Sequence, residues 1–445
     1  MKQKVVILGG GLAGLSAAEK LLDTNKFEVV ILERAPFLGG LASSFEMDGE
    51  QIPRFNHHLI RSNIITLRYL ERFNLMGNNV WKKIKMAFGV EGKLYNINTP
   101  LGLLKFNYLS LWGRFRLGFF GAYLIFLLNP EKINPELDAE TWLRKLAGKE
   151  VTEKIWYNLY ARNKFNIPLN QINAKQFANR LYEKEGYDDF TFPTKGMQGM
   201  IDGLEKNIVD KGGEINIGAS TTNLDFDKNE MDFVDAQKKE HKTRFDYFIN
   251  TIPVPELIKF AKGLPESYVA DIKKLRYTPV VGLAFATEDF LDSRHYWINL
   301  FNERVHVIYQ HSLIIDKYNS KITWCVRYGG SAEDMNKSDS EIKELYLNVL
   351  KKYFPKMKLK WCLVFRENYA EPIYDKDYSK YAPTYKTPLK QLYMAGIQVT
   401  FPKIRNMNVA LESGEKVAEY IIKDLHDYLR LMTLEFIEKK FPRGR

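Results

Sequence analysis

A glycine-rich segment near the start of the chain has the spacing of a pyrophosphate-binding turn. It reads GGGLAG over residues 9–14 and matches the pattern G-x-G-x-x-G. Such glycines permit a tight turn, close approach of the backbone to a pyrophosphate and close packing of the following helix. Glu33 follows about 20 residues later, where a carboxylate accepts hydrogen bonds from the hydroxyls of an adenosine ribose. The pattern therefore predicts dinucleotide binding.

Polar side chains set in otherwise apolar runs are candidates for a catalytic site. The FNHH segment carries two imidazoles, each of which is either a proton donor or polar anchor, or a histidine held by a backbone carbonyl. The basic residues of WYNLYARNKFN form either a solvated face or a site for a phosphate or carboxylate. The candidates for the catalytic site are His57, His58, Lys164, Arg327, Tyr328 and Tyr374.

Other catalytic and metal motifs are absent from the sequence. It contains no H-E-x-x-H, no G-x-S-x-G and no P-loop, so hydrolase and kinase functions lack support. Its two cysteines, Cys325 and Cys362, are too few for a zinc cluster, an iron-sulfur site or a disulfide framework. We therefore predict no metal site.

The elements that would position these residues lie at the two ends of the chain. Residues 4–8 and 27–32 are apolar runs typical of strands, and residues 12–22 between them have helical spacing. Together they predict a βαβ unit around the glycine turn. Near the other end, residues 392–395 predict a strand and residues 408–421 a helix.

Length, composition and charge limit the class of protein. The 445 residues suggest two or three domains, and 45% hydrophobic with 27% charged residues is ordinary globular composition. The net charge is +11, but residues 54–130 carry eleven Lys or Arg against two Glu and hold most of it. This uneven distribution gives no reason to expect a nucleic acid partner. Because the sequence starts without a secretory pattern, we expect a cytoplasmic protein.

The basic region also contains an aromatic run, residues 106–128. Its uncharged part, residues 117–128, is shorter than the ~20 residues that span a bilayer. It is either a buried helix of a substrate domain or a patch that contacts the inner face of a membrane through a ridge of aromatic side chains. That ridge would comprise Trp112, Phe119, Phe120, Tyr123 and Phe126.

The chain resembles the flavin-containing amine oxidase superfamily, which includes protoporphyrinogen oxidase, phytoene desaturase and UDP-galactopyranose mutase. The resemblance lies in a second glycine pair in ERAPFLGGLASSF and in the C-terminal segment LYMAGIQVTFPKIRNMNVALESGEKVAEYI. Leu41 stands where the amine oxidases proper usually place an arginine, which favours the protoporphyrinogen oxidase and desaturase branches. An acid normally follows the strand glycine, so Gln398 or the backbone would contact the ribityl chain here.

The resemblance implies an α/β fold with a Rossmann-like FAD-binding domain of the GR2 type and an inserted α+β substrate domain. The FAD-binding domain would comprise residues 1–90, 195–255 and 386–424. Residues 91–194 would be the helical part and 256–385 the sheet part of the substrate domain, with 425–445 as a surface-packed helical tail. The implied cofactor-binding residues are Gly9, Gly11, Leu12, Ala13, Gly14, Glu33, Arg34, Gly39, Gly40, Leu41, Thr221, Thr251, Gly396, Gln398, Met407, Asn408 and Val409.

The resemblance predicts an FAD-dependent oxidoreductase that transfers hydride between flavin and an apolar or amphipathic small molecule, either lipid-like or anionic. The alternatives are a sugar-nucleotide mutase that uses reduced FAD without net redox, and a non-catalytic flavin-binding protein. We expect the FAD to be noncovalent, because a thioether needs a cysteine near the C-terminal flavin strand and residues 363–445 contain none. The oligomeric state stays open.

Overall fold

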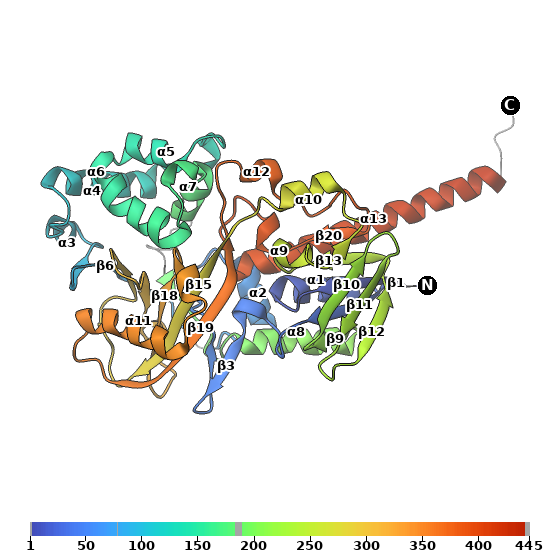
Figure 1. Ribbon diagram of the computed structural model, residues 1–445, viewed down its shortest axis with the longest axis horizontal. Coiled ribbons are helices and arrows are strands. Elements are labelled where there is room, and N and C mark those ends of the chain that lie inside the picture. The colour runs from blue at the N-terminus through green and yellow to red at the C-terminus, as the bar shows by residue number, and fades with distance from the viewer. Residues whose placement is uncertain (1, 78, 183–188, 441–445) are drawn as a thin grey trace.

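The computed structural model describes residues 2–77, 79–182 and 189–440. In this part of the chain, five parallel strands form one sheet in the order β20-β13-β1-β2-β9 (Figure 1). The sheet and the helix that follows its first strand confirm the predicted βαβ unit. The strands are β1 (Gln3–Leu8), β2 (Phe27–Glu33), β9 (Glu214–Ile217), β13 (Tyr247–Asn250) and β20 (Leu392–Met394).

Helices α1 (Leu12–Leu22) and α13 (Met407–Lys440) pack closely beside this sheet. Gly414 permits this approach, because a Cβ atom at that position would lie 2.1 Å from the carbonyl oxygen of Ala13. The Ser16 hydroxyl donates a hydrogen bond of 3.0 Å to the Leu411 carbonyl across the same contact. The two ends of the sequence are thereby held together. Two further helices pack here, α2 (Ile64–Arg72) and α8 (Gln198–Asp210).

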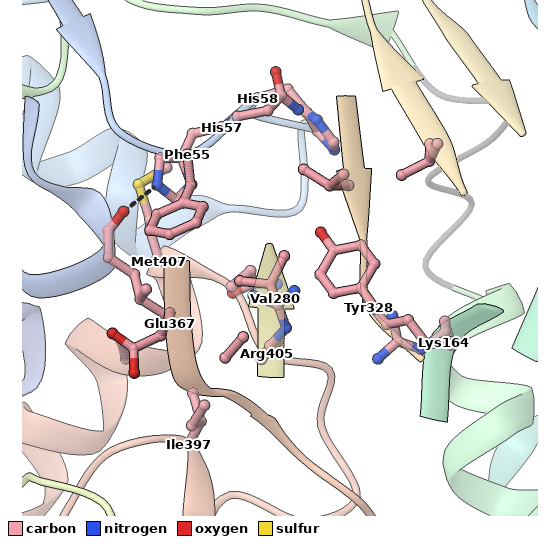
Figure 2. A pocket seen from close by; sticks show the side chains of 18 of the residues that line it. Phe55, His57, His58, Lys164, Val280, Tyr328, Glu367, Ile397, Arg405 and Met407 are labelled. Atoms are coloured by element: carbon pink, nitrogen blue, oxygen red, sulfur yellow. Dashed lines mark hydrogen bonds between the residues drawn. The ribbon is translucent and has the colours of Figure 1, made fainter. Parts of the chain in front are cut away.

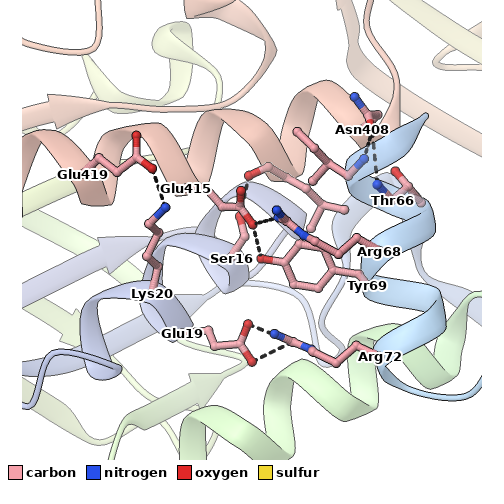
Figure 3. A network of polar contacts seen from close by, with 12 residues as sticks. Ser16, Glu19, Lys20, Thr66, Arg68, Tyr69, Arg72, Asn408, Glu415 and Glu419 are labelled. Atoms are coloured by element: carbon pink, nitrogen blue, oxygen red, sulfur yellow. Dashed lines mark hydrogen bonds and ion pairs between the residues drawn. The ribbon is translucent and has the colours of Figure 1, made fainter. Parts of the chain in front are cut away.

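A polar network fixes α2 against α1 and α13 (Figure 3). Glu415 accepts a hydrogen bond of 2.7 Å from the Tyr69 hydroxyl and pairs with Arg68. Arg72 donates to both carboxylate oxygens of Glu19, at 2.7 and 2.8 Å. Because Glu19 is buried, breaking this ion pair would be destabilising.

A second, mixed sheet lies beside the parallel one, with the order β19-β15-β18-β17-β16-β6-β7 among the described residues. Helix α11 (Asp339–Tyr353) packs on it. Its strands are β6 (Met86–Val90), β7 (Lys93–Asn96), β15 (Tyr277–Thr287), β16 (Trp297–Leu300), β17 (Val307–Tyr309), β18 (Lys321–Arg327) and β19 (Leu359–Pro372). Smaller sheets comprise β3 (Ser44–Met47) with β4 (Glu50–Pro53), β5 (Lys82–Lys83) with β8 (Asp189–Phe190), and β10 (Ser220–Asp225), β11 (Glu230–Val234), β12 (Glu240–Arg244) and β14 (Ala261–Lys262).

A helical cluster caps the end of the molecule away from the parallel sheet (Figure 1). It has its own hydrophobic core, in which Phe120 packs against Trp142 and Trp156. Its helices are α3 (Pro100–Leu104), α4 (Leu111–Phe126), α5 (Ala139–Leu146), α6 (Lys149–Val151), the π-helix η3 (Thr152–Phe165) and α7 (Ala174–Tyr182). Three short helices lie outside this cluster: α9 (Val254–Leu257), α10 (Glu266–Ile272) and α12 (Tyr378–Tyr381).

The C-terminal tail differs from its expected form. It is not a separate helix on the surface but the continuation of α13, which projects from the body of the molecule (Figure 1). Tyr428, Leu429 and Leu431 on this stretch are exposed. Residues 441–445 of the predicted tail lie outside the described residues.

Candidate functional site

A single cavity of about 1460 Å³ connects the glycine turns of the parallel sheet with the second sheet and the helical cluster. Its walls come from β1, β2, β15, β17, β19, α4 and η3, together with the loop before α13. Figure 2 shows the part between the sheets, with Phe55 and Met407 on one side and Tyr328 and Lys164 on the other. The cavity is large enough for an extended cofactor and a substrate together.

The two glycine turns meet at the end of the cavity near the parallel sheet. The Gly39 amide donates a hydrogen bond of 2.8 Å to the carbonyl of Gly10. A Cβ atom at Gly40 would lie 3.5 Å from the Cα of Gly11, so the two turns abut. Gly9 adopts φ +110°, a conformation that favours glycine. The resulting surface of exposed backbone suits a pyrophosphate, and the N-terminus of α1 adds partial positive charge.

Glu33 ends β2 at the edge of this surface. Its carboxylate accepts hydrogen bonds of 2.7 Å from the backbone amides of Gly10 and Ala35, one on each oxygen. These bonds fix the carboxylate at the cavity wall. Each oxygen keeps a further lone pair with which it could accept a ribose hydroxyl.

Most of the residues that the resemblance implied as cofactor ligands line the cavity. Three do not. Gly14 packs α1 against the carbonyl of Gly9, and the Asn408 side chain accepts hydrogen bonds from the amides of Ile65 and Thr66 at the start of α2. Val409 is buried. Those that line the cavity are Gly9, Gly11, Leu12, Ala13, Glu33, Arg34, Gly39, Gly40, Leu41, Thr221, Thr251, Gly396, Gln398 and Met407.

The side chain of Gln398 is already engaged within the protein. Its amide nitrogen donates to the carbonyls of Ala395 and Ile252, at 3.0 and 3.2 Å, and its oxygen accepts from the Tyr277 hydroxyl at 3.0 Å. This leaves the backbone of the loop after Gly396 as the better candidate for a ribityl contact.

Arg54 is a residue of this region that the sequence analysis did not select. Its guanidinium lies 4.1 Å from the ring centroid of Phe37, next to the second glycine pair, and it lines the cavity. Burial lowers the pKa of Arg54. Within the described residues no ion pair joins Arg54 to a carboxylate, and its Nε atom is buried without a hydrogen bond. An unpaired cation at this place fits a bound pyrophosphate, which carries negative charge.

His57 and His58 lie in the cavity wall as polar groups held by the protein (Figure 2). The Nε2 atom of His57 is 2.8 Å from the Leu41 carbonyl, so it donates there. The Nδ1 atom of His58 is 3.1 Å from the Tyr296 hydroxyl, and its ring stacks on Phe190. Burial lowers the pKa of His57 to about 4 and that of His58 to about 3. Both imidazoles are therefore neutral near pH 7.

Lys164 and Tyr328 also line the cavity, whereas Arg327 and Tyr374 are turned to other partners and do not. Arg327 donates to Asp334 at 2.7 Å and to Glu333 at 3.1 Å, behind the second sheet. The Tyr374 hydroxyl donates to the Ile397 carbonyl at 2.5 Å. These bonds assign Arg327 and Tyr374 to the framework of the site rather than to its surface.

Three cations surround one buried carboxylate beside Tyr328. Lys164 Nζ and Arg405 Nε each lie 2.8 Å from Oε2 of Glu371, and Arg180 pairs with Oε1. Burial raises the pKa of Glu371, but the three cations outweigh it and hold that pKa well below its usual range. Burial lowers the pKa of Lys164 to about 7. The sequence offered no signal for Arg405, Arg180 or Glu371, because they come from three separate segments.

The far end of the cavity is apolar and is lined by α3 and α4. Leu103, Leu117, Gly121 and Ile125 face it. Other side chains of the same two helices are exposed: Leu101, Leu104, Leu111, Trp112, Phe115, Phe119 and Phe126, of which Phe126 also lines the cavity. The prediction that Phe120 belongs to the exposed ridge is wrong, because its side chain is buried in the helical core against two tryptophans.

Comparison with known proteins identifies the family. The family model described as flavin containing amine oxidoreductase matches residues 12–422. The chain belongs to this family. It is 22% identical over 477 residues to 15-cis-phytoene desaturase of Solanum lycopersicum, which covers 95% of this chain and 78% of that protein. The predicted resemblance to this superfamily is thus confirmed.

Solved structures of other proteins share the fold. A structure from Exiguobacterium sp. assigned as a protoporphyrinogen oxidase superposes with a TM-score of 0.75 at 16% identity, covering 95% of this chain and 99% of that one. Reduced UDP-galactopyranose mutase gives a TM-score of 0.73 at 13% identity, covering 95% and 94%. At these identities the comparison establishes the fold, and the predicted α/β flavoprotein fold is confirmed.

Membership of a flavin oxidoreductase family agrees with the cavity described above. The abutting glycine turns, Glu33 and the unpaired Arg54 form a surface suited to a flavin dinucleotide. Cys362 packs in the second sheet and does not line the cavity, nor does buried Cys325. Among the described residues no group of His, Cys, Asp or Glu is arranged to hold a metal ion.

Proposed function

We propose that the protein is an oxidoreductase with noncovalently bound FAD that dehydrogenates or saturates an apolar or amphipathic small molecule. FAD, when bound, accepts or returns a hydride. The observation that carries the proposal is the continuity of the cavity, which runs from the glycine turns to an apolar end lined by α3 and α4. The similarity to phytoene desaturases supports an apolar substrate.

The chain's own residues would bind and orient rather than carry out covalent chemistry. Phe55 and Met407 form one wall and Tyr328 the opposite wall, which limits the substrate to the space between them (Figure 2). The neutral histidines supply polar contacts without introducing charge. An enclosed, largely apolar site also excludes water from the reacting centre.

The exposed face of α3 and α4 supports a second part of the proposal, contact with an anionic membrane from which the substrate enters. The side chains of Phe119 and Phe126 are 81% and 79% exposed, and Trp112 is exposed beside them. Lys105, which directly follows α3, and Arg114 on α4 would attract lipid phosphates. No helix in the described part of the chain is long and apolar enough to cross a bilayer.

Purified protein provides the test of the cofactor and the reaction. We expect a yellow protein that releases FAD on heating, and flavin reduction by an apolar or amphipathic alkene, with reoxidation by a quinone. A colourless protein that binds NAD would contradict the cofactor. Turnover that needs dithionite but no acceptor would instead indicate a mutase, and a reduced flavin inert to every acceptor would indicate a non-catalytic flavoprotein.

A further inference from the structure

Two cations with side chains 15% and 24% exposed face the inner part of the cavity and share one carboxylate oxygen. Lys164 and Arg405 come from η3 and from the loop before α13, and both contact Oε2 of Glu371 at 2.8 Å. Arg180 pairs with the other oxygen of the same carboxylate. Placing like charges together in a buried site is costly, so a surplus of cations here needs a reason.

Nearby acidic groups do not neutralise this surplus of positive charge. Within the described part of the chain, Glu371 is the single carboxylate that pairs with Lys164 or with Arg405. Glu367 also lines the cavity, but its Oε1 accepts the backbone amide of Tyr369, and Figure 2 shows it on the side of Met407, away from Lys164. The Lys164–Arg405–Glu371 group therefore carries net positive charge whenever Lys164 is protonated.

The unused donors of this group converge on the cavity. Arg405 binds Glu371 through Nε, and its terminal amino groups have no hydrogen-bond partner among the described residues. The Lys164 ammonium lies 4.2 Å from the ring centroid of Tyr328, and the Arg405 guanidinium carbon lies 5.7 Å from the same centroid. The Tyr328 hydroxyl likewise has no hydrogen-bond partner among residues 2–77, 79–182 and 189–440. All three side chains line the cavity.

We propose that Lys164, Arg405 and the Tyr328 hydroxyl bind a carboxylate of the substrate, whose apolar remainder extends toward α3 and α4. The substrate class is then an amphipathic carboxylic acid rather than a neutral hydrocarbon. A planar carboxylate matches the paired amino groups of an arginine. A sugar diphosphate fits less well, because the rest of this cavity, toward Leu103, Leu117 and Ile125, is apolar and offers little to sugar hydroxyls.

The inference rests on the proposed function, and its test uses probes that separate the two. Dodecanoate and methyl dodecanoate have the same apolar chain but differ in charge. Each is titrated into the flavin-loaded protein, and binding is followed by tryptophan fluorescence, since Trp156 and Trp297 line the cavity. Perturbation of the flavin absorbance gives a second readout. We expect dodecanoate to bind at least tenfold more tightly than its ester.

Substitutions at the site test whether these residues cause the preference for dodecanoate over its ester. Arg405→Gln and Lys164→Gln should each weaken dodecanoate binding tenfold or more and leave the ester unchanged, and Arg405→Lys should retain part of the affinity. Tyr328→Phe removes one hydroxyl, so it tests the site even if the charge variants fold poorly. Arg162→Gln is the matched control, because Arg162 lies on the same helix but donates to Asn302 at 2.8 Å outside the cavity.

Equal affinity for acid and ester in folded, flavin-loaded protein would overturn the carboxylate site and leave the proposed oxidoreductase intact. An acid preference that survives substitution of each of the three residues at the site would overturn it as well, since the charge would then be recognised elsewhere. Protein that binds no flavin but still prefers the acid would instead contradict the proposed function and retain the site.

Discussion

Replacing Phe119 and Phe126 by serine should remove the proposed membrane contact without harming the fold. Each side chain is about four-fifths exposed, so the loss in stability should stay within about 0.5 kcal/mol per site. Insertion of a phenylalanine into an apolar phase is worth about 1.5–3 kcal/mol, so the pair contributes roughly 3–6 kcal/mol to bilayer binding. At 1.4 kcal/mol per factor of ten, the double variant should lose at least a hundredfold in partitioning.

Co-sedimentation with anionic vesicles at low and high salt measures this effect. Basic side chains add on the order of 1 kcal/mol each, and salt screens that part but not aromatic insertion. Wild type should therefore keep part of its binding at high salt, and Phe119→Ser with Phe126→Ser should lose that part while retaining flavin. Phe120→Ala is the contrasting control, because deletion of this buried ring should cost about 3–5 kcal/mol. Wild type that ignores vesicles at every salt concentration would refute the reasoning.

Three further predictions concern the cofactor surface and the core. Glu33→Ala should raise the dissociation constant for FAD tenfold to a hundredfold, because it removes charge-assisted hydrogen bonds worth about 1.5–3 kcal/mol. Titration with flavin measures this constant, and an unchanged value would contradict the ribose contact. Arg54→Gln should weaken FAD binding yet raise the melting temperature of flavin-free protein, because it removes an unpaired, partly buried cation. If the affinity for FAD and the melting temperature of the flavin-free protein both fell, this prediction would be contradicted. Burial lowers the pKa values of His306 and His311 to about 3. As the pH falls, the unfolded chain therefore binds protons at these histidines before the folded chain does, which favours unfolding. The contribution of these histidines to the free energy of unfolding should be complete above pH 6.5 and fall by roughly 3 kcal/mol per histidine toward pH 4. Denaturation with urea at several pH values measures this fall. A free energy of unfolding that stays constant down to pH 4 would contradict the prediction.

Local patterns in the sequence predicted the fold well, because each of its parts has a local signature. The glycine turn, its flanking strands and Glu33 lie within about thirty consecutive residues, so their spacing alone indicates a dinucleotide-binding unit. The terminal helix was predicted over residues 408–421 and a surface-packed helical tail over 425–445, but one continuous helix extends from Met407 to Lys440.

The proposed substrate end of the cavity was less predictable, because its residues meet only in the folded chain. Glu371 and Arg405 are remote from Lys164 in sequence, and nothing in their neighbourhoods indicates that one carboxylate joins them. Which aromatic residues of a helix face the core was equally difficult to predict. Phe119 and Phe120 are adjacent aromatic residues, yet one is exposed and the other is in the core, since consecutive residues on a helix point about 100° apart.

Charge in the cavity is arranged so that binding and protonation depend on each other. The two histidines near the glycine turns are neutral at pH 7, whereas burial brings the pKa of Lys164 to about 7. A carboxylate bound beside Lys164 and Arg405 would favour the protonated amine and so raise that pKa. The same linkage makes the protonated lysine the form that binds an acid, whereas a neutral hydrocarbon would favour the uncharged amine. The ionisation of one buried lysine therefore distinguishes the two substrate classes.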